Sequence, residues 1–330
     1  MTFKYNNVYV NDTSTVTGPY EKDGPLEKYF DKSYKDLYFG TNSWEKAEEK
    51  LVEDSVKILL KKTKLNKDEI DLVIGGDLLN QITATTYGTS GVGKSYLGVY
   101  NACATSVEEI IIASSLIDDK RIENALCTTS SHNMTSEKQF RNPTEYGAPK
   151  PSTATFTATG AASILLSKDK SKIKVESGTI GKITDYDQTD VNNMGAVMAC
   201  AAAYTINKHL IDTKRTPDYY DLILTGDLGR YGKNILIEYM KEEYKIDLTE
   251  NYNDCGVMLY DLEKQEEVQA GGSGPVCSAL VNYSYVMEKL KNKELKKVLL
   301  VATGALFSPT FVFQGQNILS IAHAISLEAI

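Results

Sequence analysis

The sequence predicts an α/β protein made of two pseudo-equivalent halves, residues 1–169 and 170–330, packed into one layered body. Two short segments give the first sign of a repeat: DLVIGGDLL begins at Asp71, and DLILTGDLG begins 150 residues later at Asp221. Each is an apolar run that ends in a Gly-Asp turn, which is typical of a buried parallel strand. Strands that alternate with helices in this way predict parallel sheets covered by helices on both faces.

A helical stretch precedes each of these predicted strands. In the first half it is WEKAEEKLVEDSVKILLKKTKL, which begins at Trp44 and places apolar side chains at helical spacing opposite a charged face. In the second half it is VMACAAAYTINKHLI, which begins at Val197 and carries few charges. We therefore expect the first helix to expose one face and the second to be buried on most sides.

A second pair of matched segments follows in the same order. Cys103 lies in YNACATSVEEIIIASSLI, and the strand-like ALCTTSS begins 22 residues later at Ala125. Cys277 lies in GPVCSALVNYSYVMEKL, and LLVATGA begins 22 residues later at Leu299. The two cysteines are 174 residues apart, which predicts an insertion in the second half that includes NDCGVMLYDLEKQEEVQ.

Each half is predicted to end in a further strand, GAASILLSK at 160–168 and LSIAHAISLE at 319–328. The stretch SKDKSKIKVE between the halves contains neither proline nor glycine, so we interpret it as a hairpin or crossing loop. One body is therefore expected in place of two domains on a flexible linker.

Composition and charge exclude several classes of protein. The chain has 330 residues and a formal charge of −8 with acids and bases interspersed, so it lacks the basic patch that nucleic-acid binding needs. Five cysteines without a C-x-x-C pair indicate a reduced intracellular protein, and we expect neither a metal ion nor a cofactor. The start MTFKYNNVYVND does not have the pattern of a secretory signal, and the longest apolar runs are too short to span a bilayer. Any association with a membrane is therefore expected to be peripheral.

Residues 88–95 read GTSGVGKS, which matches the phosphate-loop pattern. Such a loop should run directly from a strand and open a helix at the Lys-Ser pair. Here the preceding predicted strand ends near Leu79, and the following YLGVYNACATS is predicted to be another strand. We therefore interpret the segment as a glycine-rich turn rather than a nucleotide site.

Cys103 is the first candidate for chemistry. A predicted strand from Leu97 to Tyr100 runs into a turn of small residues, and Cys103 lies where a long apolar helix begins. The positive end of a helix dipole lowers the pKa of a thiol and favours the reactive thiolate. The alternative is a plain buried cysteine, which is the commonest state of this residue.

Two α/β halves, with a cysteine opening the long helix of the first, resemble thiolases and ketoacyl condensing enzymes. The resemblance implies the thiolase fold, in which the two halves form an αβαβα layered body. In that superfamily the cysteine attacks an acyl thioester, and histidine and asparagine from the second half activate it. Backbone N–H groups form the oxyanion hole.

The resemblance can be followed residue by residue. Cys103 matches the nucleophile, and Gly304 in VATGALFS matches a late glycine turn of the oxyanion hole. The place of the first catalytic histidine falls on about Gly226, and that of the second partner on about Gly272. Neither glycine can move a proton, so we expect a vestigial nucleophile. His132 remains a candidate for a rescuing base, against a structural or ligand-contacting role.

Within the superfamily, the sequence is most similar to the stage V sporulation protein AD family. The similar segments are GGDLLNQI, YNACATS, SSHN followed by EKQFRNPTEYG, TATGAASILLS, TGDLGRYG, GGSGPVCSA and SIAHAISLE. That family is implicated in loading dipicolinic acid (pyridine-2,6-dicarboxylate) into the developing spore. The resemblance therefore implies a non-catalytic sporulation protein that binds dipicolinic acid, with a later part in its release at germination. It also implies a forespore protein peripherally associated with the spore inner membrane, beside other stage V sporulation A proteins.

A thiolase cavity could bind a small aromatic dianion with donors that once stabilised an oxyanion. The second carboxylate would need a cation or further donors, for which Lys150 is one candidate, while Asp227 would repel a dianion unless paired. The predicted ligand-binding residues are Cys103, Thr105, His132, Asn133, Gly226, Arg230, Gly272, Ser273 and Gly304.

Four further expectations remain open. One alternative is an active acyltransferase or condensing enzyme that uses Cys103 as its acyl-accepting nucleophile, and another is a scaffold that binds no small molecule. The family plan implies a homodimer that pairs through the strand LGVYN at 97–101. The aromatic-rich segment 18–40 is expected to be a covering loop, a cavity lid or a docking surface.

Overall fold

The computed structural model describes residues 1–140 and 150–330. Twelve of the described strands form one continuous sheet, in which the same order of five strands occurs twice. In the first half the order is β2 (Tyr9–Thr17), β8 (Gly160–Ser167), β6 (Asn124–Ser131), β4 (Leu72–Gly76) and β5 (Ser95–Gly98). In the second half it is β9 (Ile173–Ile180), β14 (Leu319–Ala329), β13 (Lys297–Leu306), β10 (Leu222–Thr225) and β11 (Tyr252–Asp254).

The two halves join through a short antiparallel contact between β2 and β9, where Tyr9 pairs with Lys174 and Val10 with Ile173. Because β2 lies between β8 and β9, the connection SKDKSKIKVE crosses from one half to the other and is not a hairpin. Four short strands complete the set: β1 (Thr2–Lys4) on β9, β3 (Lys32–Ser33) on β2, and β7 (Phe156–Thr157) paired with β12 (Gly272–Ser273).

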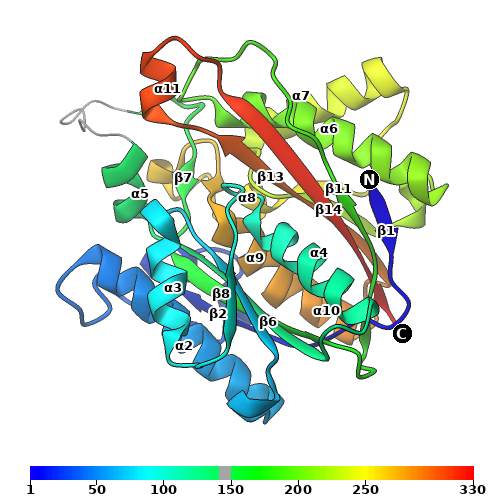
Figure 1. The fold of residues 1–330 in the computed structure, drawn as a ribbon. Helices are drawn as coiled ribbons and strands as arrows, with labels where there is room; N and C mark the ends of the chain where they lie inside the picture. The colour runs from blue at the N-terminus through cyan, green and yellow to red at the C-terminus, as the bar shows by residue number, and fades with distance from the viewer. Residues whose placement is uncertain (141–149) are drawn as a thin grey trace.

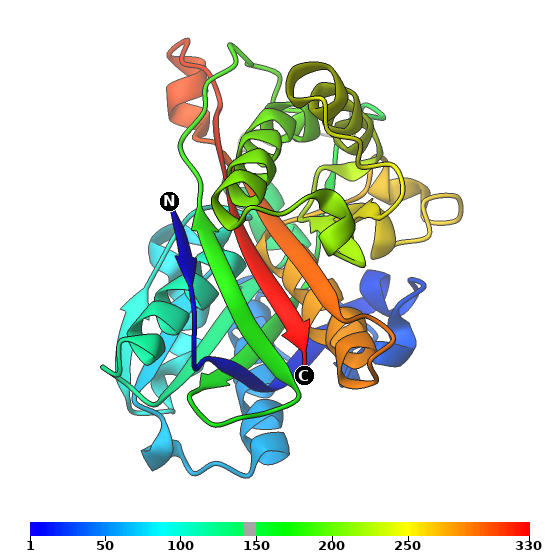
Figure 2. The ribbon, with the colours of Figure 1, turned by 90° about the vertical axis from the view of Figure 1, so that its right-hand side faces the viewer.

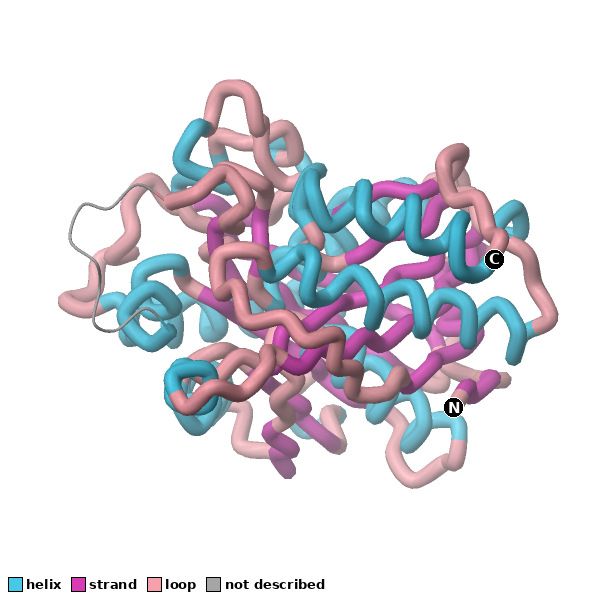
Figure 3. The backbone as a smooth tube through the Cα atoms, turned by 90° about the horizontal axis from the view of Figure 1, so that it is seen from above, coloured by secondary structure: helices cyan, strands magenta, loops and turns pink. Residues whose placement is uncertain are grey.

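Helices make three of the five layers, as Figures 1 and 2 show. On the outer face of the first half lie α2 (Trp44–Thr63) and α3 (Thr83–Ser90), and on the outer face of the second half lie α6 (Met194–Thr213) and α7 (Gly229–Tyr244). The central layer holds α4 (Thr105–Asp118), α9 (Pro275–Val281), a π-helical turn (Asn282–Val286) and α10 (Met287–Lys291). Figure 3 shows from above how helices run across the strands of the sheet.

The remaining helical elements are short. They are α1 (Pro19–Lys22), α5 (Asn133–Phe140), α8 (Cys255–Met258), α11 (Pro309–Phe313) and 3₁₀ turns at Glu27–Tyr29, Lys67–Glu69, Asn80–Ile82, Pro217–Tyr219 and Glu266–Val268. Within the described part of the chain, no helix combines the length and apolar character needed to cross a membrane.

The long outer helices α2 and α6 begin at Trp44 and Met194, so they keep the 150-residue offset of the sequence repeat. Ser43 caps the first, because its hydroxyl accepts a hydrogen bond from the N–H of Lys46 at 3.3 Å. That helix buries one face and leaves most of its charged side chains at least partly exposed, although Glu48 is fully buried, whereas the second buries most of its length, including Ala199 and Ala203. Both expectations from hydrophobic patterning are confirmed.

The elements around residues 88–95 do not form a phosphate-binding loop, as predicted. The glycine-rich segment begins inside the last turn of α3 and does not follow a strand, and β5 begins at Ser95 where a nucleotide site would open a helix. Lys94 donates to the carbonyl of Asp68 at 3.0 Å and lies 3.6 Å from its carboxylate. The lysine therefore ties two loops together.

Candidate functional site

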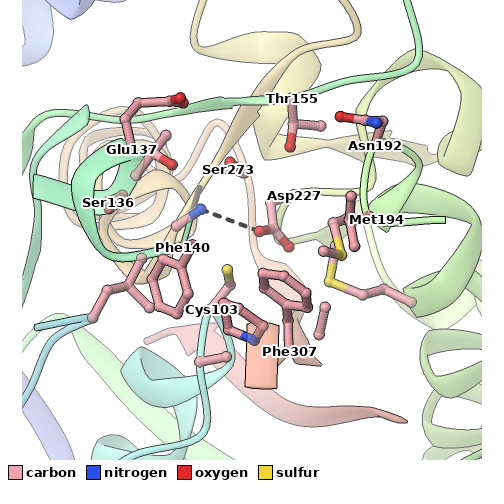
Figure 4. A pocket seen from close by; sticks show the side chains of 18 of the residues that line it. Cys103, Ser136, Glu137, Phe140, Thr155, Asn192, Met194, Asp227, Ser273 and Phe307 are labelled. Carbon is pink, nitrogen blue, oxygen red and sulfur yellow. Dashed lines mark hydrogen bonds between the residues drawn. The ribbon is translucent and has the colours of Figure 1, made fainter. Parts of the chain in front are cut away.

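A cavity of about 440 Å³ lies where the two halves meet. Its polar lining includes Cys103, Asp227 and Ser273, which Figure 4 shows from close by. Further polar lining residues are Ser136, Glu137, Lys150, Thr155, Thr157, Asn192 and Gly274. The rest of the wall is largely apolar and comes from α5, α6 and the segment around α11. Its main apolar side chains are Leu78, Phe140, Met194, Met198, Phe307, Val312 and Phe313.

The turn that carries Cys103 is held by Thr105. The Thr105 hydroxyl accepts from the N–H of Asn101 at 3.0 Å and donates to the carbonyl of Ala102 at 2.7 Å. Ala102 has a φ of 49°, an uncommon backbone conformation for a residue with a Cβ. α4 begins two residues after Cys103, so Thr105 is fully buried beneath the cavity instead of lining it.

Thr105→Val should destabilise the fold by about 1–3 kcal/mol, because it deletes both hydrogen bonds while nearly preserving the volume of the side chain. Thr105→Ser restores the hydroxyl and is expected to recover most of the loss. Urea denaturation of both variants measures the effect. Equal stability of Thr105→Val and the unmodified protein would show that the turn needs no such support.

Asp227 approaches Cys103 from the second half. It follows β10 by two residues and is fully buried, and its carboxyl interacts with the Cys103 thiol. One carboxyl oxygen accepts from the Thr303 hydroxyl at 2.6 Å, and the other accepts from the N–H of Gly274 at 3.2 Å (Figure 4). Gly274 has a φ of 96°, which a residue with a side chain rarely adopts.

Burial dominates the protonation of this pair. It raises the pKa of Asp227 to about 7, with Asp254 adding to the rise and hydrogen bonds from Cys103 and Thr303 opposing it. Burial, followed by the charge of Asp227, raises the pKa of the Cys103 thiol well above its usual range. The expectation that the helix terminus would favour the thiolate is therefore wrong, because desolvation and a neighbouring carboxyl outweigh the helix dipole.

Asp254 fixes the loop behind Asp227. It is fully buried and accepts from the N–H groups of Leu228 at 2.9 Å and Gly229 at 3.0 Å, and from the Thr225 hydroxyl at 2.7 Å. These bonds join β11 to the start of α7. The backbone at Asp227 is consequently held in place from both sides.

The three glycines taken from the family plan lie next to the cavity without lining it. Gly226 directly follows β10, as expected of the first histidine position, but the side chain that meets Cys103 belongs to Asp227, one residue later. Gly272 lies in β12, beside Ser273, which does line the cavity. Gly304 was expected in a turn and lies within β13, paired with Ile321.

Of the cationic candidates, Lys150 lines the cavity and Arg230 does not. Lys150 donates to the carboxylate of Glu137 at 2.7 Å. Arg230 is exposed on α7, and its guanidinium donates to the carbonyl of Leu262 at 3.3 Å. The helix turns this arginine outward, a direction that sequence spacing did not reveal.

The structure places His132 and Asn133 behind the wall and not in it. One ring nitrogen of His132 donates to the carbonyl of Leu37 at 2.9 Å, and the other accepts from the N–H of Met134 at 3.1 Å. Burial lowers the pKa of His132 to about 4, so its ring is neutral and fully engaged. This arrangement removes His132 as a rescuing base. Leu37 belongs to the segment 18–40, none of which lines the cavity.

The other two histidines are structural as well. His209 lies between the Thr179 hydroxyl and the Tyr220 hydroxyl, at 2.7 Å from each. His323 accepts from the N–H of Gly181 at 3.2 Å and also contacts the Asn101 amide. Within residues 1–140 and 150–330, no group of three or more His, Cys, Asp or Glu side chains is arranged to hold a metal ion.

Sequence reasoning missed most of the apolar wall. Phe140 from α5 and Phe307 after β13 face each other from the two halves, with ring centroids 6.1 Å apart. Nothing in the repeat marks these residues, because they lie in segments that the two halves do not share. The part of EKQFRNPTEYG at 141–147 falls outside the described residues.

Comparison with known proteins agrees with this architecture. A cerulenin-bound OleA from Xanthomonas campestris is 12% identical and covers 98% of this chain and 99% of its own, with a TM-score of 0.64. The 3-oxoacyl-(acyl-carrier-protein) synthase III from Aquifex aeolicus VF5 is 12% identical and covers 97% and 99%, with a TM-score of 0.58. At these identities the likeness establishes the thiolase fold alone.

Sequence similarity identifies the family. The model of the family described as stage V sporulation protein AD matches residues 1–328. The stage V sporulation protein AD of Bacillus subtilis (strain 168) is 45% identical over 322 residues, which are 97% of this chain and 94% of that protein. The chain therefore belongs to the stage V sporulation protein AD family and is a sporulation protein with the thiolase fold.

Proposed function

We propose that the chain binds dipicolinic acid in the cavity between its halves and takes part in the uptake of this acid into the developing spore. The observation that carries the proposal is the composition of the cavity wall, where an aromatic pair faces polar groups and one lysine. Small-molecule sites of this size usually combine a mostly apolar wall with a few polar groups that fix orientation. Membership of the stage V sporulation protein AD family supports dipicolinic acid as the ligand.

The wall suggests how a planar dicarboxylate would lie. Phe140 and Phe307 pack against each other with ring centroids 6.1 Å apart and together form an aromatic part of the wall, against which an aromatic ring would pack. One carboxylate would contact Lys150, exchanging part of its ion pair with Glu137. The other would meet the Ser273 hydroxyl and a protonated Asp227, which can then donate a hydrogen bond.

Acyl transfer is the weaker candidate for this site. A nucleophilic cysteine needs a thiolate or a base that can take its proton. Here the pKa of the Cys103 thiol is raised, and its partner Asp227 becomes protonated at about pH 7. Proton transfer from thiol to carboxylate is therefore uphill. We infer a binding protein that keeps its thiol without using it as a nucleophile.

Isothermal titration calorimetry with dipicolinate tests the proposal. Lys150→Ala should weaken binding about tenfold or more, since a cation that contacts a carboxylate contributes on the order of 1.4 kcal/mol. Lys138→Ala is the matched control, because Lys138 also pairs with a glutamate near α5 but does not line the cavity. If the folded protein gives no heat of binding at millimolar dipicolinate, the proposal fails and the alternative of a scaffold that binds no small molecule is favoured. Stable acylation of Cys103 by acyl-CoAs, seen by mass spectrometry, would instead favour the acyltransferase.

We further propose that the protein works beside other stage V sporulation A proteins at the spore inner membrane, in uptake and later in release at germination. In this picture it is made in the forespore without a membrane span of its own and attaches peripherally. It would act as a homodimer that pairs through β5. That strand bonds only to β4 among the described strands and exposes Tyr96 and Leu97 at an open sheet edge.

Leu97→Lys should shift the protein from dimer to monomer, because a charge on an edge strand opposes strand pairing. Ile211→Lys is the control, since Ile211 is an exposed apolar residue on α6, away from the edge. Sedimentation equilibrium measures both variants. A monomer for the unmodified protein at high concentration would contradict the proposed pairing.

A further inference from the structure

An acidic and aromatic surface borders the cavity on the side of the second half. We call it the rim patch and define it by Ile183, Asp185, Tyr186, Asp187, Phe311 and Phe313. Its residues come from the segment between β9 and α6 and from α11, which lie at the same end of the molecule in Figure 1. Phe313 also lines the cavity, so the patch reaches the cavity wall.

Hydrogen bonds join the two segments of the rim patch into one surface. The Asn317 amide donates to both carboxylate oxygens of Asp185, at 3.1 and 3.3 Å, and to Asp187 at 3.1 Å. Thr184 and Ser320 pair nearby, with their hydroxyls 2.8 Å apart. The acidic groups are thus fixed beside α11 by the fold.

The apolar members of the rim patch are unusually exposed for large side chains. Phe313 is 79% exposed, Phe311 59% and Ile183 58%. Tyr186 packs edge-on against Tyr239 of α7, with ring centroids 6.4 Å apart. Clustered exposed aromatic side chains on a protein are typical of contact surfaces, where they become the anchors of an interface.

Charge decides what such a surface can receive. Residues 183–207 and 298–330 contain neither lysine nor arginine. Lys182, the basic residue next to the patch in sequence, lies over the ring of Tyr204 at 4.3 Å. Among the described residues, no basic side chain lies within ion-pair distance of Asp185 or Asp187. The patch is therefore negative and apolar together.

We propose that the rim patch docks a basic polypeptide segment that also carries apolar side chains. The partner's cations would meet Asp185 and Asp187 while its apolar residues cover Phe311 and Phe313. A bilayer is a poorer fit, because anionic lipids repel a carboxylate pair that no lysine or arginine offsets. The docked segment would lie at the cavity, so a partner could receive or deliver a ligand there. The docking itself does not depend on which ligand the cavity binds.

The test uses the full chain and a fluorescent amphipathic peptide of about 18 residues with leucine and lysine at helical spacing. Fluorescence anisotropy should detect binding that weakens as salt is raised. Asp185→Asn/Asp187→Asn and Phe311→Ser/Phe313→Ser should each lower the affinity at least fivefold. A peptide with glutamate in place of lysine should not bind.

Matched controls keep the result specific. Glu266→Gln/Glu267→Gln removes two exposed acids elsewhere, and Tyr87→Ser removes a tyrosine that is exposed on α3, so both should bind the lysine peptide like the unmodified protein. Melting temperatures establish that each variant is folded. Absence of binding by the unmodified protein, or equal binding by the rim variants, would overturn the proposal. Binding of the unmodified protein to phosphatidylglycerol vesicles that the Phe311→Ser/Phe313→Ser change abolishes would overturn it in favour of a lipid surface.

Discussion

Gly304→Ala is expected to destabilise the protein by about 1–3 kcal/mol and to abolish ligand binding, because the new methyl group overpacks the centre of the fold. A Cβ at Gly304 would lie 2.5 Å from the carbonyl oxygen of Asn101 and 3.2 Å from the backbone nitrogen of Ala104. Both are backbone atoms of the turn that carries Cys103, so the turn itself must move. Differential scanning calorimetry gives the stability, and titration with dipicolinate gives the affinity.

Gly91→Ala is the matched control for this change. A Cβ at Gly91 would meet nothing within 4 Å, and the φ of Gly91 is −66°, which any residue adopts. The control should unfold within about 0.5 kcal/mol of the unmodified protein. Normal binding by Gly304→Ala would mean that the Cys103 turn can shift without disturbing the cavity, which contradicts the geometry described above.

Dipicolinate should bind more weakly as the pH rises, and Asp227→Asn should remove that dependence. The pKa of Asp227 is raised to about 7, so below pH 7 its carboxyl is mainly protonated and above pH 7 it is mainly charged. A bound dianion favours the protonated form still more, so binding takes up a proton above pH 7. Affinity should therefore fall by about fivefold between pH 7 and pH 8, and by about tenfold for each further pH unit.

The asparagine variant replaces the carboxyl with a neutral group of the same shape. Its affinity should stay nearly constant between pH 6 and pH 8, and at pH 8 it should exceed that of the unmodified protein. Asp68→Asn serves as the control, because Asp68 is fully exposed and far from the cavity wall. Calorimetry in buffers of different ionisation heat counts the protons directly. A flat pH profile for the unmodified protein would exclude a protonated Asp227 in the complex.

Asp227 shows why the candidate site could be found only in part. Its strand was recognised from the 71–79 and 221–229 repeat, and Gly226 was given the position of a missing histidine. Asp227, the residue next to Gly226, was expected only to repel a bound dianion. Its hydrogen bonds to Thr303 and Gly274 come from segments about 50 to 75 residues away in the chain, and no local pattern records such contacts.

The predicted ligand-binding residues fall into two groups, those that line the cavity and those that do not, because contacts between distant segments decide which way each side chain faces. Cys103, Ser273 and Lys150 line the cavity. Thr105 and His132 are instead consumed by backbone hydrogen bonds. Proximity to a site in sequence did not distinguish a side chain that faces a cavity from one that holds the cavity's wall.

The sequence by itself indicated the two halves, several of their helices and strands, and the position of Cys103 before the central helix. Those features depend on hydrophobic periodicity and on segments matched at a fixed spacing, which are properties of the chain alone. Only the tertiary structure decided the chemical state of the site. The pKa values of Cys103 and Asp227 depend on burial and on groups that approach through space from the other half, and these exist only once the halves have packed together.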